Sequence, residues 1–325
     1  MNAVRYSLRQ LEYFVAVADA GTLSGAAARL HVSQPGLSQS LTDLERALDV
    51  QLAVRRKAHG VTLTPTGVQV LRHARELLRH ADDLTSVASG GDALSGVLSL
   101  GCYVTLAPTA LPSLLQDFTA LHPRLTIDFV EGTQDVLQRQ LLLGELDLAI
   151  LYDMEIQPDM ERAVIDSARP HILLPADHRL ARRRKVSLAE LAAEPMVLLD
   201  APPSSHNTLA IFERFGVRPD VRYRPKTFEL TRALVGRGMG YALLVQRPAN
   251  DRTYEGHPVV VKEIAEPVGD SRVLIAWPKA TRLNRRAQAF VEFCQQRGRS
   301  PASREPGQIR TRTQRGARTT SGAAR

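Results

Sequence analysis

The chain has 325 residues, a formal net charge of +8 and only two cysteines, Cys102 and Cys294. This length indicates two or three domains, and two cysteines are too few for a disulfide framework or a thiolate metal site. No apolar run approaches the roughly 20 residues that span a bilayer. The N-terminal "MNAVRYSLRQLEYF" lacks the apolar core of an export signal, so we expect a cytoplasmic protein with no membrane partner.

Three short helices are predicted near the N-terminus. Residues 8–20 place an apolar face at Leu8, Leu11, Phe14, Val15 and Ala18. A second helix over residues 23–30, "LSGAAARL", has small residues that permit close packing. The connection to a third helix takes only residues 31–33, and such a tight turn between helices is typical of a helix-turn-helix.

The third helix lies in "HVSQPGLSQSLTDLERAL", residues 31–48, where Leu37, Leu41, Leu44 and Leu48 form one apolar stripe. Ser33 suits the N-cap, and a proline is tolerated in the first turn. Away from the leucines lie short polar side chains, at Ser33, Gln34, Ser38, Gln39 and Thr42. Such a face is suited to hydrogen bonding with a surface that approaches closely.

A small β-hairpin is predicted next. Residues 55–67, "RRKAHGVTLTPTG", alternate briefly around a turn at His59-Gly60. This hairpin, or wing, carries Arg55, Arg56 and Lys57.

A long helix over residues 65–89 follows the wing. Its small and apolar residues step by three and four, at Leu71, Ala74, Leu78, Ala81, Thr85 and Ala88. We expect this face to be a short coiled-coil seam between two subunits, because no partner for it is evident in the same chain. The following "SGGDALSG", residues 89–96, is typical of a hinge.

Strands and helices alternate beyond the hinge. Strands are predicted at 97–103, 125–131, 147–152, 169–174, 196–199, 220–224, 240–245, 259–264 and 272–277. Helices are predicted at 108–121, 133–143, 205–215, 228–237 and 282–296. This pattern indicates an α/β chain with mainly parallel sheets, long enough for two small lobes with a cleft between them.

The positive charge is concentrated at the C-terminus. Residues 298–325 contain seven arginines and one acid, Glu305, and so carry +6 of the net +8. The basic composition is therefore weak support for DNA binding by the folded domains. The tail is poor in large apolar residues, and we expect it to be disordered, either as a solvated extension or as a segment that attracts phosphates non-specifically.

Three stretches resemble LysR-type transcriptional regulators. "LRQLEYFVAVADAGTLSGAAARLHVSQPGLSQSLTDLERAL", followed by "LTPTG", is similar to the N-terminal region of that family. "LPSLLQDFTALHPRLTIDFVEGT" with "LLLGELDLAI" resembles the first lobe of the family's effector domain, and "TRALVGRGMGYALLVQRP" resembles the second. The resemblance extends to about Arg297, and its specificity comes from the order and spacing of the motifs.

Three positions depart from the family pattern. Gly36 stands where a larger residue such as alanine is usual, Asp49-Val50 takes the place of a glycine, and Ala53 replaces a phenylalanine before the wing. These departures concern the packing of helix and wing and not the fold.

The resemblance implies an α + α/β architecture: a winged helix-turn-helix over 1–64, a linker and dimerisation helix over 65–92, an effector-binding domain over 93–297 and the tail over 298–325. The effector domain is expected to resemble periplasmic binding proteins, with lobe I at about 93–166 and 267–297 and lobe II at about 167–266. The family implies a regulator at the nucleoid that assembles as a homodimer or homotetramer. Its partners would be double-stranded DNA and a small effector, with RNA polymerase as a candidate.

The third helix is expected to enter the major groove, so that its N-terminal residues reach base edges. Glutamine can pair bidentately with adenine, and serine and threonine bond several bases. Base contacts are predicted for Gln34, Pro35, Ser38, Gln39 and Thr42, and phosphate contacts for Ser33, Arg55, Arg56 and Lys57. Without the family resemblance, the same residues could equally form the solvated face of a helical bundle.

The effector is expected between the lobes, at strand-to-helix turns whose free N–H groups favour anions. The residues predicted to line this site are Tyr103, Thr105, Thr133, Ser204, Ser205, Thr227 and Phe228. Tyr103, His206 and Phe228 would stack on an aromatic ligand. An N-cap or turn role is the alternative for each. Ligand binding would favour one lobe closure or subunit arrangement and so alter DNA bending or half-site spacing.

Other functions were compared with this one. An enzyme is disfavoured, because "VGRGMG" follows a helix and precedes a strand, the reverse of a dinucleotide fingerprint, and no other catalytic motif appears; we expect no cofactor and no metal. A solute-binding protein would need an export signal, whereas a constitutive DNA-binding regulator with an empty α/β domain stays open. Cys102 has no evident partner in Cys294, so a buried core role is favoured over redox sensing.

Overall fold

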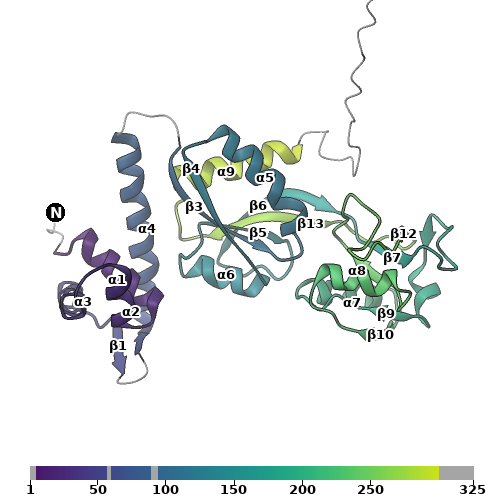
Figure 1. The fold of residues 1–325 in the computed structure, drawn as a ribbon, viewed down its shortest axis with the longest axis horizontal. Coiled ribbons are helices and arrows are strands. Elements are labelled where there is room, and N and C mark those ends of the chain that lie inside the picture. The colour runs from purple at the N-terminus through teal and green to yellow at the C-terminus, as the bar shows by residue number, and fades with distance from the viewer. Residues whose placement is uncertain (1–4, 57–59, 89–93, 300–325) are drawn as a thin grey trace, which may run out of the picture.

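The computed structural model describes residues 5–56, 60–88 and 94–299. An N-terminal helical domain, a long helix and two α/β lobes follow one another along the longest dimension of the molecule (Figure 1). Among the described residues, none of the helices is both long and apolar enough to cross a membrane.

The N-terminal domain consists of α1 (Leu8–Ala20), α2 (Leu23–Arg29), α3 (Gln34–Leu48) and the hairpin of β1 (Ala53–Arg56) and β2 (Gly60–Leu63). Each helix begins after a residue whose side chain accepts a hydrogen bond from a free backbone N–H, at Ser7, Thr22 and Ser33. The predicted three helices and wing are therefore confirmed as elements. The turn was expected at His59-Gly60; Gly60 begins β2, whereas residues 57–59 lie outside the described residues.

The long helix α4 (Pro65–Ala88) packs against α1 of its own chain. Leu71 and Ala74 are buried in the apolar cluster that also contains Phe14 and the leucines of α3, and Leu78 packs against that cluster. The predicted seam is thus wrong in its first half, because this face has a partner in the same chain. The side chains of Thr85 and Ala88 are outside the described set.

Lobe I is built on a five-stranded sheet with the order β4-β3-β5-β13-β6. The strands are β3 (Gly96–Tyr103), β4 (Leu125–Gly132), β5 (Leu148–Tyr152), β6 (Met160–Ala168) and β13 (Ser271–Pro278). Two helices, α5 (Ala107–Leu121) and α9 (Arg285–Arg299), cover one face, and α6 (Gln134–Leu142) covers the other (Figure 1).

Lobe II contains a four-stranded sheet, β11-β7-β12-β8, and a two-stranded sheet, β10-β9. Its strands are β7 (His171–Pro175), β8 (Lys185–Val186), β9 (Pro195–Val197), β10 (Asp220–Tyr223), β11 (Ala242–Leu244) and β12 (Val259–Ile264); its helices are η1 (Leu188–Leu191), α7 (Ser204–Arg214) and α8 (Phe228–Gly236). A parallel bridge between Met196 and Tyr241 links the two sheets.

The prediction of mainly parallel sheets is wrong. β13 is antiparallel to both β5 and β6, and β7 is antiparallel to both β11 and β12. β6 was not predicted, because it is an edge strand with many exposed and charged residues. The short β8 and η1 were not predicted either.

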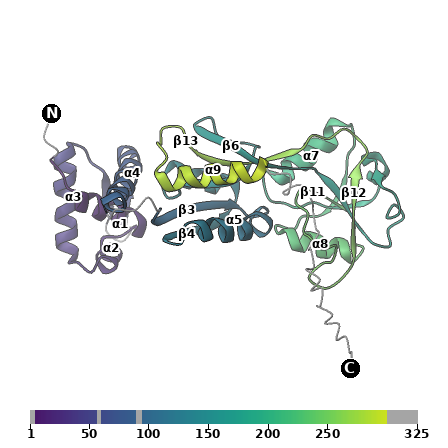
Figure 2. The ribbon, with the colours of Figure 1, turned by 90° about the horizontal axis from the view of Figure 1, so that it is seen from above.

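Two crossover segments connect the lobes, one between β6 and β7 and one between β12 and β13. They lie close together, because Ala168 at the end of β6 pairs with Ser271 at the start of β13. The view from above shows that lobe I lies between α4 and lobe II (Figure 2). Both ends of lobe II join lobe I at the same point.

Candidate DNA-binding surface and effector site

The N-terminal half of α3 presents its polar side chains to solvent, while Leu37, Leu41 and Leu44 are fully buried beneath it. Gln34, Pro35 and Gln39 are exposed. The Gln39 amide donates to the Asp43 carboxylate over 2.9 Å, and Arg46 donates to the same oxygen over 3.0 Å. The helix thus offers a row of small and amide side chains, and the Asp43 carboxylate beside them is paired with Arg46.

Arg55 of the wing is bound to α3. Its guanidinium donates to the Ser38 hydroxyl over 2.7 Å and to the Thr42 hydroxyl over 2.9 Å. Glu45 fixes the start of the wing strand by accepting from the backbone N–H groups of Leu52 and Ala53. Ser38 and Thr42, predicted to contact bases, are therefore half-buried under Arg55.

The other predicted phosphate-binding residues are only partly described. Ser33 caps α3 by accepting from the N–H of Gly36 over 3.2 Å. Arg56 ends β1, but its side chain is outside the described set, as is all of Lys57.

The predicted effector residues Tyr103 and Ser204 meet where the lobes touch. The Tyr103 hydroxyl donates to the carbonyl of Ala201 over 2.6 Å and lies 3.1 Å from the Ser204 hydroxyl. Burial raises the pKa of Tyr103 above its ordinary value, so the phenol is a neutral hydrogen-bonding group. One apolar cluster continues through this contact from lobe I into lobe II.

Two buried hydroxyls near this contact lack partners. Thr105 is 5 % exposed and Ser205 is 2 % exposed, and neither side-chain oxygen makes a hydrogen bond of normal geometry among the described residues, although Thr105 lies close to the hydroxyls of Tyr103 and Tyr152. A buried polar group without a partner is costly.

The helices that follow the strand ends are also open at their N-termini. α5, α6, α7 and α8 begin without a side-chain cap, whereas α1, α2 and α3 are all capped. The residue before each of these helices therefore supplies no side-chain acceptor to the first N–H groups, although the N–H of Ser204 in α7 donates to the carbonyl of Ala201 over 2.9 Å.

The remaining predicted residues make no hydrogen bond to Tyr103 or Ser204 among the residues that the structure describes. Thr133 and Thr227 are exposed and precede α6 and α8. Phe228 packs against the apolar cluster, and His206 bonds Glu155 over 2.7 Å. No hydrogen bond between Thr133 or Thr227 and the Tyr103 cluster occurs in the described part of the chain.

Two known protein-family models match this chain and together cover most of it. Residues 8–68 match the model of the bacterial regulatory helix-turn-helix protein, lysR family, and residues 91–299 match the LysR substrate binding domain. The chain belongs to the LysR family of transcriptional regulators. It is therefore a DNA-binding transcriptional regulator with an effector-binding domain.

Similar proteins agree with this assignment. HinK, a LysR family transcriptional regulator from Pseudomonas aeruginosa, is 37 % identical, with a TM-score of 0.61 over 90 % of this chain and 98 % of its own. A full-length variant of OxyR from Pseudomonas aeruginosa is 25 % identical, with a TM-score of 0.70 over 89 % of this chain and 97 % of its own. A hydrogen peroxide-inducible genes activator from Pectobacterium carotovorum is 32 % identical over 73 % of this chain and 79 % of its own.

This LysR-family chain uses polar residues between its lobes that sequence reasoning missed. Gln246 donates to the Tyr152 hydroxyl over 3.0 Å and accepts from Thr109 over 2.8 Å, so it ties lobe II to lobe I. Tyr152 also packs edge-on against Tyr103, with ring centroids 5.6 Å apart. Tyr152 ends β5 and Gln246 follows β11, so the strand-end argument used for other turns would have found both.

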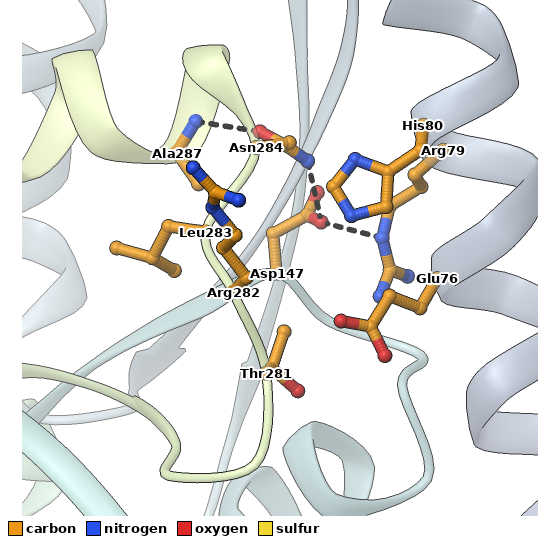
Figure 3. Close-up of a pocket in the computed structure, with 9 residues that line it drawn as sticks. All are labelled: Glu76, Arg79, His80, Asp147, Thr281, Arg282, Leu283, Asn284 and Ala287. Carbon is orange, nitrogen blue, oxygen red and sulfur yellow. Dashed lines mark hydrogen bonds and ion pairs between the residues drawn. The ribbon is translucent and has the colours of Figure 1, made fainter.

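A polar junction joins α4 to lobe I (Figure 3). The Asp147 carboxylate, whose side chain is 4 % exposed, accepts from Arg79 Nε over 3.0 Å and from Asn284 over 3.3 Å. Arg79 also donates to the carbonyl of Gly144 over 2.9 Å. One turn earlier, Arg75 donates to the carbonyl of Leu143.

The same junction reaches the N-terminal domain, because Arg75 also pairs with Asp19 of α1. Gly144 lies against α4; a Cβ added there would stand 3.6 Å from the carbonyl oxygen of Arg72. Two arginines of one helix therefore hold the turn between α6 and β5 and the first helix of the winged domain together.

Proposed function

We propose that this regulator recognises its operator through the exposed face of α3 and is controlled by a small molecule bound between its lobes. The observation that carries the effector half is a pair of buried hydroxyls, at Thr105 and Ser205, that make no hydrogen bond of normal geometry among the described residues. They lie beside the hydrogen bonds that join the lobes and beside helices with uncapped N-termini. A ligand that satisfies them gains more in one lobe arrangement than in another, as ligand control requires.

The DNA half is supported by the leucine-backed face of α3. Gln34 and Gln39 are the exposed amides on that face, and an amide can bond adenine bidentately. Arg55 and the N-terminus of α3 suit phosphates. Ser38 and Thr42 become available to bases only when Arg55 leaves them, so we assign them to the bound state.

The first experiment selects binding sites from a library of random DNA duplexes with the full-length chain. We expect the wild type to enrich one motif, and the double variant Gln34→Ala, Gln39→Ala to lose that enrichment while its oligomeric state is unchanged. Gln116→Ala, which removes an exposed amide from α5, is the matched control. An unchanged motif in the double variant would show that α3 is not the reading element.

The second experiment compares two buried threonines. Among the described residues Thr105 makes no hydrogen bond of normal geometry, whereas Thr231, which is fully buried, donates to the carbonyl of Thr227 over 3.0 Å. In the ligand-free chain we expect Thr105→Val to raise the free energy of unfolding by up to about 1 kcal/mol and Thr231→Val to lower it by about 1 kcal/mol. Urea titration measures both.

The functional arm of that experiment screens wild-type protein against single carboxylates, phenols and amides by thermal shift. A compound that stabilises the wild type is expected to lose its effect on Thr105→Val. If Thr105→Val destabilises the free protein and leaves every such effect intact, the hydroxyl is a structural group and the proposed site is wrong.

Thiol oxidation is an alternative way to control this regulator, because one relative is a hydrogen peroxide-inducible genes activator. Here both cysteines are buried. Burial raises the pKa of the Cys102 thiol far above its ordinary value and that of Cys294 to about 12. Because the thiolate is the reactive species, these sites favour control by a ligand over control by peroxide.

Oligomer formation is part of the proposal. α4 exposes Leu77 and Leu84, which are seven residues apart and do not belong to the apolar cluster of Leu71 and Ala74, and this spacing suits pairing with a second α4. We propose that this face, and not the predicted Leu71 face, joins two subunits at chromosomal promoters in the cytoplasm. RNA polymerase stays a candidate partner.

A further inference from the structure

A pocket of about 330 Å³, here called the hinge pocket, lies where the two crossover segments pass between the lobes. Its walls come from α7 of lobe II, from the end of β5 and the start of β13 in lobe I, and from the segment before β13. The volume lies in the range of small-molecule sites. None of the residues predicted to bind the effector lines it.

Two acids and two arginines line this hinge pocket. Its two acids already have partners outside it: Asp153 pairs with Arg162 over 3.0 Å, and Asp270 pairs with Arg169 over 3.0 Å. Two arginines line the pocket itself, and they come from different lobes. Arg272 lies 3.9 Å from Asp153, whereas among the described residues Arg214 has no acidic partner and stacks on Phe215 at 5.7 Å.

Neutral hydrogen-bonding groups accompany the arginines. Ser271 is only 5 % exposed, and its hydroxyl has no hydrogen-bond partner within the described part of the chain. Asn207, one turn into α7, lines the same pocket, and its side-chain amide is likewise unpaired among the described residues. Both side chains can therefore bond a molecule that occupies the pocket.

The rest of the lining is apolar. Ile211 and Phe215, four residues apart on α7, form one wall with Met154 and Val268 opposite the helix. Because α7 presents its C-terminal end here, the helix dipole does not attract an anion, and the guanidinium groups must do so. The pocket therefore combines donors and positive charge with a face for a hydrocarbon group.

We propose that this hinge pocket is a second ligand site, for small monocarboxylates with an apolar body. The carboxylate would accept hydrogen bonds from Arg214, Arg272 and Ser271, and the apolar body would pack on Ile211 and Phe215. Since the walls belong to both lobes, an occupant ties α7 to the start of β13. Such a ligand would act on the angle between the lobes from a place separate from the interlobe hydroxyls.

The test uses three probes of similar shape and different charge: phenylacetate, phenethylamine and 2-phenylethanol. Calorimetric titration of the full-length chain is expected to show saturable binding of phenylacetate alone. Arg214→Met and Ser271→Ala should each raise its dissociation constant, by about tenfold for the arginine. Arg218→Met, which removes an exposed arginine outside the pocket, should leave it unchanged.

Three outcomes would overturn the proposal: no saturable binding of phenylacetate, equal or tighter binding of the amine, or undiminished binding in both pocket variants. Circular dichroism confirms that each variant is folded, and Ser271→Ala provides a test that removes no charge. Binding lost in Thr105→Val but kept in Arg214→Met would place the probe between the lobes instead. None of these outcomes bears on the proposed recognition of DNA by α3, which the selection of binding sites tests.

Discussion

At the residue scale, Arg55 shows how one side chain serves two surfaces. In the free protein it satisfies the hydroxyls of Ser38 and Thr42 and lies 4.0 Å from Glu45. These bonds hold the wing strand against α3 in a fixed relation. A duplex that approaches α3 offers phosphate oxygens as new acceptors, so the guanidinium can exchange partners without becoming unpaired.

Asp49 supplies a residue-scale prediction. It ends α3 in the left-handed conformation, with φ 54° and ψ 39°, and its side chain is exposed. Left-handed backbone costs an L-residue about 1–2 kcal/mol, and glycine avoids most of that cost. We expect Asp49→Gly to raise the free energy of unfolding by about 0.5 kcal/mol, after the larger entropy of unfolded glycine is subtracted. Urea titration measures it; Asp49→Ala is the control and should not stabilise.

Single residues were predictable where a local rule applies. Ser33 as N-cap and the buried leucines of α3 follow from spacing alone. The contact of Arg55 with Ser38 spans 17 residues of chain, and no local pattern encodes it. Tyr103 and Ser204 were both predicted to line the effector site from their places after strands, and their hydroxyls lie 3.1 Å apart, but the hydrogen bond of Tyr103 to the Ala201 carbonyl was not foreseeable.

At the element scale, α4 shows that the spacing of apolar residues does not reveal which partner covers an apolar face. The three- and four-residue steps identified an apolar face, yet α1 and not a second subunit covers its first half. A sequence period reports that a face is buried but not by what. The arginines on the same helix were missed for a related reason, since Arg79 and Asp147 are far apart in the chain.

The junction between α4 and lobe I gives the element-scale prediction. Asp147→Asn leaves the guanidinium of Arg79, whose side chain is 20 % exposed, without its carboxylate. We expect a loss of about 3 kcal/mol in the free energy of unfolding, because breaking a buried pair leaves an uncompensated charge. Adding Arg79→Met should recover part of that loss.

A double-mutant cycle measures this coupling, expected to exceed about 1 kcal/mol. The exposed pair Arg184–Glu263, at 3.4 Å, is the control and should couple by less than that. Equal coupling in the two pairs would contradict a specific role for Asp147 at the junction.

At the scale of the whole molecule, strand direction was the least predictable property. Alternating strands and helices indicated an α/β chain, and that class holds. The chain enters β13 only after the whole of lobe II, however, and β13 then runs antiparallel to its neighbours. Direction in a sheet depends on where the chain returns from, which one-dimensional patterns do not record.

Acid sensitivity is the whole-molecule prediction. Burial lowers the pKa of His171 in β7 to about 4, so the folded chain keeps this imidazole neutral while the unfolded chain protonates it below about pH 6.5. Stability from this group is present above pH 6.5 and is lost as pH falls toward 4, by about 2 kcal/mol at pH 5. Urea titrations at pH 7 and pH 5 measure the loss, which His171→Gln should largely remove; an equal pH dependence in that variant would assign the effect to other groups.

The pairing of Ala168 with Ser271 makes lobe II an insertion into one β-hairpin. A chain in which a tight two-residue turn replaces residues 169–270 would keep every strand of the lobe I sheet in its present order. Such a shortened molecule would keep the winged domain, α4 and lobe I but no residue of lobe II, so it would separate DNA binding from any response that needs both lobes.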